Sequence, residues 1–239
     1  MNVLAQGGVM LIAGVIVFRT VLVGGHVNYV RPGLGLPLLL GAAIMMLVGV
    51  ASLWSRVAGG DEPAHEHVVG HTHHGPGVGW LLLVPMLALI TIPQIPLGSF
   101  AAGLGAGRSP VRAAIDFPPL PDSKDGTIDL PVSAFVSRAL YAPETLEGKP
   151  VRLVGFVTPD SEAPSGWFLT RFSIGCCAAD AFPLKVAVLN EVPRQADEWI
   201  EVVGVFKPGA SREAGNSAPP QLGVVEARSI PQPDNPYEY

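Results

Sequence analysis

Charged residues are scarce in this chain, and the scarcity is uneven. They make up 15% of the 239 residues, whereas soluble domains hold about 25%. Residues 1–115 contain five arginines, three acidic residues and no lysine, and the remaining residues carry a formal charge of −7. The composition therefore indicates a membrane region followed by a soluble acidic part. An acidic part excludes a nucleic-acid partner, because such binding depends on phosphate neutralisation by lysine and arginine.

Cysteine is almost absent. The two cysteines are adjacent in the sequence, so no disulfide framework can be derived from their spacing. Histidine is missing from residues 116–239, which leaves the cysteines without a histidine base in the soluble part. A nucleophilic cysteine paired with histidine is therefore disfavoured, and we expect a protein that is not an enzyme.

Three long apolar runs occupy the first part of the chain. A transmembrane helix needs about 20 mostly apolar residues, and residues 9–30, 34–54 and 79–100 each reach that length. A cleaved signal peptide explains the first run less well, because no lysine or arginine precedes it and a second apolar run follows at once. Residues 1–107 are therefore predicted to form a transmembrane region of three helices.

One charge interrupts the first run. Arg19 lies near the middle of residues 9–30, where an arginine costs about 2.5–3.5 kcal/mol on insertion scales. Such a side chain either extends to the membrane interface or faces protein, and we expect a partner-facing role. The second run carries small residues that permit close helix packing: Gly41, Ala42, Ala43 and Gly49.

The second part of the chain has the pattern of a small β domain. Residues 108–148 are predicted to be a connector with one short helix at Val132–Tyr141, and residues 233–239 a tail. Residues 149–232 contain five short apolar segments separated by turn residues, which indicates a barrel or sandwich. The expected strands are Val151–Val157, Trp167–Ile174, Leu184–Leu189, Trp199–Phe206 and Leu222–Ile230.

Two strand phrases, GKPVRLVGFV and WIEVVGVF, each hold an internal glycine. They look like the first and fourth strands of an OB-fold barrel, with Gly155 and Gly204 at the sharp bends that close it. The fold class is therefore α+β, with an N-terminal three-helix transmembrane region followed by a small all-β OB-like barrel domain.

The segment Gly175-Cys176-Cys177-Ala-Ala-Asp180 lies between the second and third expected strands. Adjacent strand residues point to opposite faces, so both thiols can serve one metal ion only if the chain turns, which Gly175 would permit. Three interpretations stay open: a buried cysteine used as a small apolar residue, a metal or metal-transfer site of Cys176, Cys177 and Asp180, and a redox thiol or vicinal disulfide.

Residues 61–74, DEPAHEHVVGHTHH, hold five of the six histidines. These are His65, His67, His71, His73 and His74, in a loop between the second and third runs. Neutral imidazole is a good ligand for zinc and related ions, but the spacing fits neither a helical catalytic zinc site nor a zinc finger. The interpretation is a loose collector or sensor of a transition metal such as zinc; a solvated polar loop is the alternative.

Together these features resemble the YcgQ-like family of bacterial membrane proteins, described as permease subunits. The resemblance rests on the three apolar runs, the histidine-rich loop, and the segments RFSIGCCAAD, DEWIEVVGVF and PDNPYEY. It implies a multi-pass protein of the bacterial cell membrane that works with a multi-span permease subunit.

We therefore expect an accessory membrane subunit of a two-component permease, linked to the handling of zinc or another transition metal. Two alternatives stay open: a membrane-tethered metal-binding or sensing module without a transport role, and a thiol-dependent enzyme. The side of the membrane that the β domain faces is also open. Arginine counts near the runs favour the cytoplasm, whereas analogy with the cytoplasmic histidine loops of metal transporters favours the outside.

Overall fold

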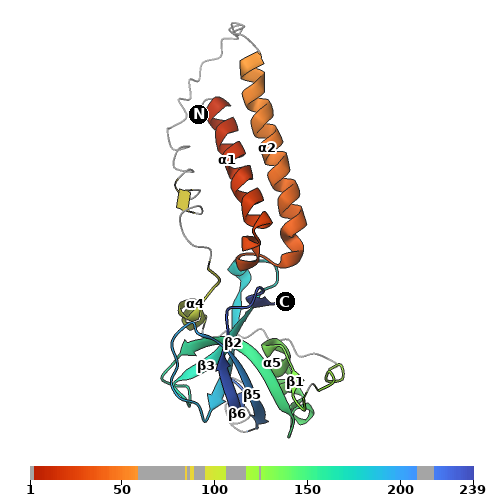
Figure 1. Ribbon diagram of the computed structural model, residues 1–239, viewed down its shortest axis with the longest axis vertical. Coiled ribbons are helices and arrows are strands. Elements are labelled where there is room, and N and C mark those ends of the chain that lie inside the picture. Colours follow the sequence, from red (N-terminus) through yellow and green to blue (C-terminus); the bar gives the residue numbers. More distant parts are fainter. Residues whose placement is uncertain are drawn as a thin grey trace. The chain divides into compact units, whose positions relative to one another are not determined.

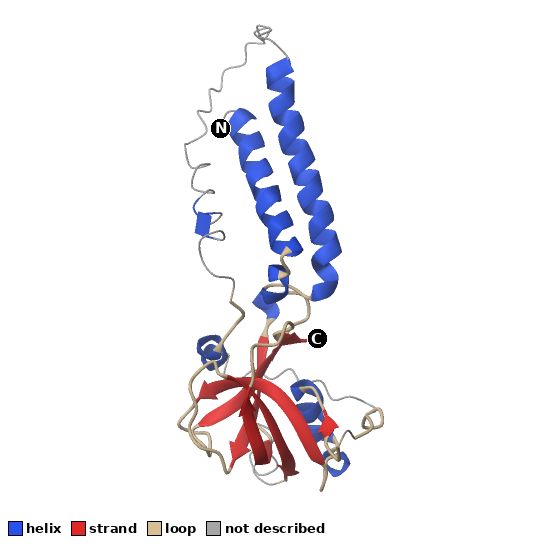
Figure 2. Ribbon diagram, in the orientation of Figure 1, coloured by secondary structure: helices blue, strands red, loops and turns tan. Residues whose placement is uncertain are grey.

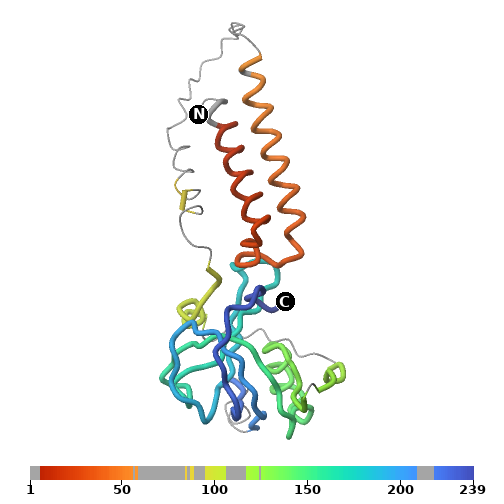
Figure 3. Tube along the Cα trace, in the orientation of Figure 1, coloured from red at the N-terminus to blue at the C-terminus, as the bar shows by residue number. Residues whose placement is uncertain are grey.

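The computed structural model describes residues 3–58, 84, 87–88, 95–105, 117–123, 125–208 and 218–239 (Figure 3). The chain divides into two compact units. One comprises Met1–Val27 with Arg31–Ile95, and the other comprises Asn28–Val30 with Pro96–Tyr239. Each unit is described by itself.

The first unit contains a pair of apolar helices that lie side by side, α1 (Val3–Leu22) and α2 (Gly35–Ala58) (Figures 1 and 2). Two short 3-10 helices, η1 (Gly25–Asn28) and η2 (Pro32–Leu34), lie between them in the sequence. Among the described residues, Pro32–Ser55 alone is long and apolar enough to cross a membrane, and Gln6–Leu22 is a shorter apolar helix. One candidate membrane helix is thus present, by length and composition only.

Small residues bring the two helices together. A Cβ added to Gly14 would lie 2.9 Å from the carbonyl oxygen of Ala42, and one added to Gly49 would lie 2.9 Å from that of Gly7. Even alanine at Gly14 or Gly49 would therefore push the helices apart, so the predicted role of Ala42 and Gly49 in close packing is confirmed. Gly41 lies elsewhere on the helix, because nothing is within 4 Å of its added Cβ.

The first helix ends earlier than the predicted run of residues 9–30. It stops at Leu22, and Gly24 then adopts a positive φ of 77°, a conformation that ends helices and favours glycine. Arg19 is therefore exposed in the last turn of α1 rather than near the middle of a span. A cation there is stabilised by the unpaired carbonyl groups of the helix end, and its partner-facing role stays a prediction.

Most of the third predicted run, residues 79–100, lies outside the described residues, as does the whole histidine loop, residues 61–74. Three transmembrane helices are therefore not established. Near the end of that run the chain enters the second unit with a short helix, α4 (Ser99–Leu104), which contacts the barrel strands β2 (Pro150–Pro159) and β3 (Trp167–Ser173).

The second unit is built on a closed five-stranded barrel (Figure 1). All five predicted strands are confirmed with bounds shifted by at most about two residues: β2 (Pro150–Pro159), β3 (Trp167–Ser173), β4 (Phe182–Leu189), β5 (Trp199–Lys207) and β6 (Gln221–Ser229). Antiparallel pairs join β2 to β3 and β5, β3 to β4, and β5 to β6; a parallel pair of β4 and β6 completes the ring. This non-sequential order is of the Greek-key kind found in OB-fold barrels.

Apolar side chains fill the barrel, and a helix covers part of it. Leu153, Leu169 and Ile200 are each 0% exposed inside the barrel. Helix α5 (Val132–Tyr141), predicted with these bounds, buries an apolar face against β2, β3 and β4. The ring of Phe135 meets that of Phe206 edge-on, with centroids 6.0 Å apart. The helix thus extends the core.

Two glycines permit the strands to bend, as the sequence predicted. A Cβ on Gly155 would lie 2.6 Å from the carbonyl oxygen of Thr170, and one on Gly204 would lie 2.5 Å from that of Gly223. The register of β5 against β6 shifts between Val203 and Gly204, which is the signature of a bulge. Only glycine leaves room for these close backbone approaches.

Two short strands extend the sheet, and the sequence pattern predicted neither of them. Strand β1 (Ile128–Asp129) pairs in parallel with β2, and β7 (Tyr237–Glu238) pairs in parallel with β3. The predicted tail, residues 233–239, therefore contributes a strand to the β domain. A strand of two residues has no periodicity to detect.

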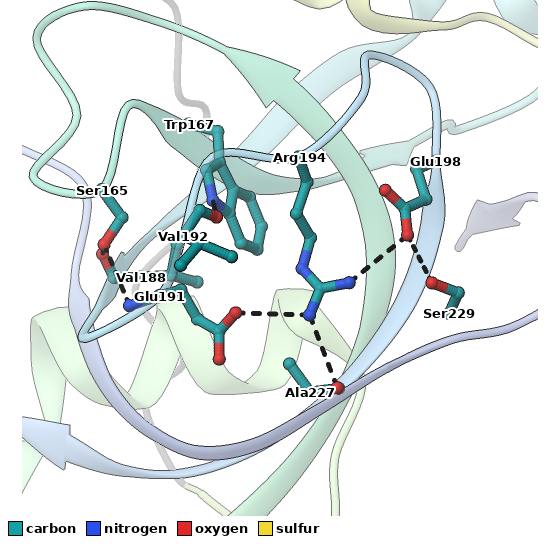
Figure 4. A network of polar contacts seen from close by, with 9 residues as sticks. All are labelled: Ser165, Trp167, Val188, Glu191, Val192, Arg194, Glu198, Ala227 and Ser229. Carbon is teal, nitrogen blue, oxygen red and sulfur yellow. Dashed lines mark hydrogen bonds and ion pairs between the residues drawn. The ribbon is translucent and has the colours of Figure 1, made fainter.

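The loop between β4 and β5 is held in place by Arg194 (Figure 4). Its guanidinium donates to the carboxylates of Glu191 and Glu198, at 3.3 Å in each case. Glu198 also accepts a hydrogen bond from the hydroxyl of Ser229 on β6, and that bond lowers the pKa of Glu198. The indole N–H of Trp167 donates to a main-chain carbonyl of the same loop at 3.0 Å. This network is structural.

Candidate functional site

The loop between β3 and β4, residues 174–181, brings two thiols and a carboxylate together and is called the cysteine loop below. The Sγ atoms of Cys176 and Cys177 are 3.6 Å apart, and one ligand atom from each of Cys176, Cys177 and Asp180 lies within 4.8 Å of the others. The chain bends at Gly175 and Cys176 and then forms a 3-10 helix, η5 (Ala178–Asp180). The sequence predicted that the two thiols could approach one ion only if the chain turned here. The turn is present, and the thiols lie close together.

Asp180 maintains this bend through its carboxylate. Its Oδ1 accepts the backbone N–H of Gly175 at 3.0 Å, and its Oδ2 accepts that of Cys176 at 2.8 Å. A Cβ on Gly175 would lie 3.1 Å from Oδ2. The absence of a side chain at Gly175 leaves space for the carboxylate of Asp180. Gly175 does not adopt a positive φ, so glycine is not needed there for its backbone conformation.

The same loop pairs with residues far away in the sequence. Cys177 forms an antiparallel bridge with Val30, and the N–H of Ala178 donates to the carbonyl oxygen of Tyr29 at 2.7 Å. Asn28–Val30 belongs to the barrel unit although it lies between α1 and α2 in the sequence. The thiols are thus attached to the segment that joins the two apolar helices.

Tyr237 makes a second attachment to that segment. Its hydroxyl donates to the carbonyl oxygen of Asn28 and accepts the N–H of Leu97, at 2.9 Å in both cases. The side chain is 2% exposed, and burial raises the pKa of its phenol, so the hydroxyl stays neutral and able to donate. The sequence interpretation missed this residue. Its only signal was the unusual segment PDNPYEY.

Other residues of the same segment tie it to the barrel. The carboxylate of Glu238 accepts the N–H groups of Val132 at 2.8 Å and Ser133 at 2.7 Å, which are among the free donors at the start of α5. The buried Arg171 donates to the carbonyl oxygen of Asn235 at 2.5 Å. Residues 235–238 therefore link helix α5, strand β3 and the segment between α1 and α2.

The Cys176 thiol and the Asp180 carboxylate modify each other's acidity. The hydrogen bond between Cys176 and Asp180 is the largest cause that raises the pKa of the Cys176 thiol to about 11, and the contact with Cys177 adds to it. Backbone donors, led by the N–H of Cys176, lower the pKa of Asp180. At neutral pH the site therefore holds a protonated Cys176 beside an ionised carboxylate, which disfavours a reactive thiolate.

The structure separates the predicted site residues into three groups. Cys176, Cys177 and Asp180 converge, with Cys176 and Asp180 exposed and Cys177 half-buried. The histidines of the second predicted metal-binding group lie outside the described residues: His65, His67, His71, His73 and His74. Arg19 belongs to the helical unit. Metal binding by either group stays a prediction.

A concavity of about 470 Å³ lies on the barrel beside Arg152 and Glu201. Its charged groups are mostly engaged with each other: Arg152 pairs with Asp129 at 2.7 Å, and Arg228 pairs with Glu201 at 2.9 Å. Arg171, which also lines it, places its guanidinium 4.8 Å from the ring centroid of Trp199. Within the described residues, the Nε and Nη1 atoms of Arg171 have no hydrogen-bond partner, so the concavity keeps unpaired donors, whereas the loop after β3 brings metal-ligand atoms together.

Residues 133–239 match the DUF1980 C-terminal domain. The DUF1980 C-terminal domain thus begins within α5 and includes the whole barrel, the cysteine loop and Tyr237. No match was found among curated proteins or solved structures. The match covers the β domain and names no activity, and the finer YcgQ-like assignment stays a prediction.

Proposed function

We propose that the protein is a membrane-anchored accessory subunit of a permease that handles a transition-metal ion. One observation carries the proposal: the barrel domain holds Asn28–Val30 through Cys177, Ala178 and Tyr237. This segment is the connection between α1 and α2 in the sequence, so the barrel domain is tied to the connection of the two apolar helices.

The same observation supports a third crossing of the membrane. If α1 and α2 both cross, their connection lies on the side of the barrel and the end of α2 lies on the opposite side. The chain must then return before Leu97, which donates its N–H to Tyr237. The part of the predicted run that precedes Leu97, residues 79–96, is close to the length that a crossing needs. The histidine loop, residues 61–74, would then face the side opposite the thiols.

A permease is the proposed partner for two reasons. The resemblance to the YcgQ-like family supplies a multi-span partner subunit. In addition, α2 exposes large apolar side chains along its length, among them Leu36, Leu47 and Trp54, which are 67%, 70% and 71% exposed. Such a surface suits lipid and the helices of a membrane partner. Two separate groups of metal ligands, one on each side, would suit an ion that crosses.

Affinity purification of the tagged protein from its native membrane in mild detergent tests the proposal. A multi-span permease should co-purify in a constant ratio. A chain that purifies without a membrane partner in several mild detergents would contradict the accessory role.

Deletion of Asp61–His74 then separates transport from sensing. For a transport subunit, the deletion should change the zinc content of cells at limiting zinc, with expression and membrane insertion unaltered. If zinc content stays constant while only a downstream response changes, the protein is a tethered sensor and the transport role is wrong.

A further inference from the structure

We propose that Cys176, Cys177 and Asp180 form an exchangeable site for one thiophilic divalent ion, with Zn²⁺ as the ion and an open fourth position. The inference deepens the proposed function, on which its biological role rests, because it names the ion class and the place where the barrel would hold it. The geometry of the loop supports the site independently of that role.

The separation of the thiols fits one tetrahedral ion. Two thiolates bound to the same Zn²⁺ at about 2.3 Å lie about 3.8 Å apart, and the Sγ atoms of Cys176 and Cys177 are 3.6 Å apart. Adjacent residues of a regular strand would point their thiols to opposite faces. The bend at Gly175 and Cys176, with η5 after it, is what turns both thiols to one ion-sized space.

Asp180 is placed to be the third ligand while it keeps the loop bent. Each carboxylate oxygen accepts about two hydrogen bonds or ligand contacts, and the N–H groups of Gly175 and Cys176 occupy one position on each oxygen. The remaining positions are available, and an oxygen lies within 4.8 Å of both sulfurs. Two thiolates and one carboxylate more than balance the charge of Zn²⁺, so the loaded site would carry a net charge of about −1.

Exposure indicates an exchangeable ion and not a structural one. Structural zinc sites use four protein ligands, whereas sites with three ligands keep a position for water or an incoming donor. The described residues offer three ligands here, and Cys176 and Asp180 are both exposed to solvent. An incoming thiolate or imidazole from a partner could therefore occupy the fourth position and take the ion.

The choice of ion follows from the donor atoms. Magnesium and calcium need six or more oxygen ligands, which this loop does not supply. Thiolates favour zinc and other thiophilic ions. Zinc binds cysteine as the thiolate, so binding of Zn²⁺ should release protons, as it does at other cysteine sites.

Titration of the reduced, purified full-length protein with Co²⁺ tests the site. Cobalt bound by thiolates gives a charge-transfer band in the near ultraviolet that histidine ligands do not give, so the histidine loop does not interfere. We expect the band to saturate at one thiolate-bound Co²⁺ per chain, to be lost when Zn²⁺ displaces the cobalt, and to be absent in Cys176→Ser and in Cys177→Ser. Asp180→Asn should weaken the affinity by about tenfold or more.

Controls make each outcome decisive. Glu147→Gln removes an exposed carboxylate outside the loop and should leave the affinity unchanged. Prior alkylation of both thiols in the otherwise native chain should also abolish the band, which excludes misfolding of the Ser variants as the cause. Absence of the band in the reduced native chain, or one ion shared by two chains, would overturn the proposal. The titration needs no permease, so its failure and the failure of co-purification are separate results.

Discussion

The hydroxyl of Tyr237 donates a hydrogen bond of 2.9 Å to the carbonyl oxygen of Asn28, across 209 positions of the sequence. Asn28 lies between α1 and α2, and Tyr237 lies in β7, the strand added beside β3. The hydroxyl oxygen of Tyr237 also accepts the N–H of Leu97. One buried side chain therefore joins the connection of the helix pair, the segment before α4 and the barrel domain.

Replacement of Tyr237 by Phe should destabilise the protein. Phenylalanine fills the same space but removes the hydrogen bonds of the hydroxyl with the carbonyl of Asn28 and the N–H of Leu97, and each such bond contributes about 0.5–1.5 kcal/mol. We expect a clear fall in Tm in detergent. The control is Tyr239→Phe, which removes the hydrogen bond of a 42% exposed tyrosine to Asn235 and should have a smaller effect. Equal Tm values for both variants would contradict the role of Tyr237.

Replacement of Glu238 by Ala should loosen the start of α5. The carboxylate pairs with the N–H groups of Val132 and Ser133, and loss of a comparable helix cap costs about 1 kcal/mol. Hydrogen exchange should accelerate at the first turn of α5 and remain unchanged in β5. Glu162→Ala, at an exposed carboxylate, is the control. If exchange in α5 stays as slow as in the native chain, the cap does not stabilise the helix.

Alkylation of Cys176 should be slow at neutral pH and should accelerate toward high pH. Only the thiolate reacts, and the hydrogen bond to Asp180 raises the pKa of Cys176 to about 11. The raised pKa means that the folded state favours the protonated thiol, so the thiolate fraction stays low until the pH approaches that value.

Asp180→Asn should remove most of this effect. At pH 8 the alkylation rate of the metal-free protein should rise by about tenfold or more, since a fall of one unit in pKa raises the thiolate fraction about tenfold. Glu147→Gln should leave the rate unchanged. A native chain that is already half-maximally reactive near pH 8.5, the usual range for cysteine, would refute the proposed pairing of thiol and carboxylate.

Gly204→Ala should destabilise the barrel. The added Cβ would lie 2.5 Å from the carbonyl oxygen of Gly223, so β5 and β6 must separate, which typically costs about 1–3 kcal/mol. Gly103→Ala is the matched control, because nothing lies within 4 Å of its added Cβ in α4; alanine there should keep or raise the Tm. A stable Gly204→Ala variant would show that the bend does not require glycine.

The barrel could be predicted because its information is local. Alternating apolar residues and an internal glycine identify β2 and β5, and the helix Val132–Tyr141 has a continuous apolar face. The contacts of Tyr237 could not be predicted this way. They join residues 28, 97 and 237, which no periodic pattern relates, and β7 has only two residues.

The cysteine loop could be predicted only in part. The sequence identified Cys176, Cys177 and Asp180 and the condition that the chain must turn, but it assigned the turn to the backbone freedom of Gly175. In the structure the carboxylate of Asp180 holds the turn by accepting two backbone N–H groups. A side-chain contact of this kind, between residues four and five apart in a loop, leaves no mark on the hydrophobic pattern.

Sidedness of labelling tests the proposed membrane arrangement most directly. Cys176 and Cys177 are the only thiols in the chain. Once both are changed to Ser, a single new cysteine can be introduced, either Gly33→Cys or Thr72→Cys, in separate variants. A membrane-impermeant maleimide is applied to intact cells and, as the reference for complete labelling, to permeabilised cells. We predict that Cys176 and the cysteine at position 33 share one side and that the cysteine at position 72 has the opposite accessibility. Labelling of position 33 and Cys176 from opposite sides, or of position 72 and Cys176 from the same side, would contradict the arrangement.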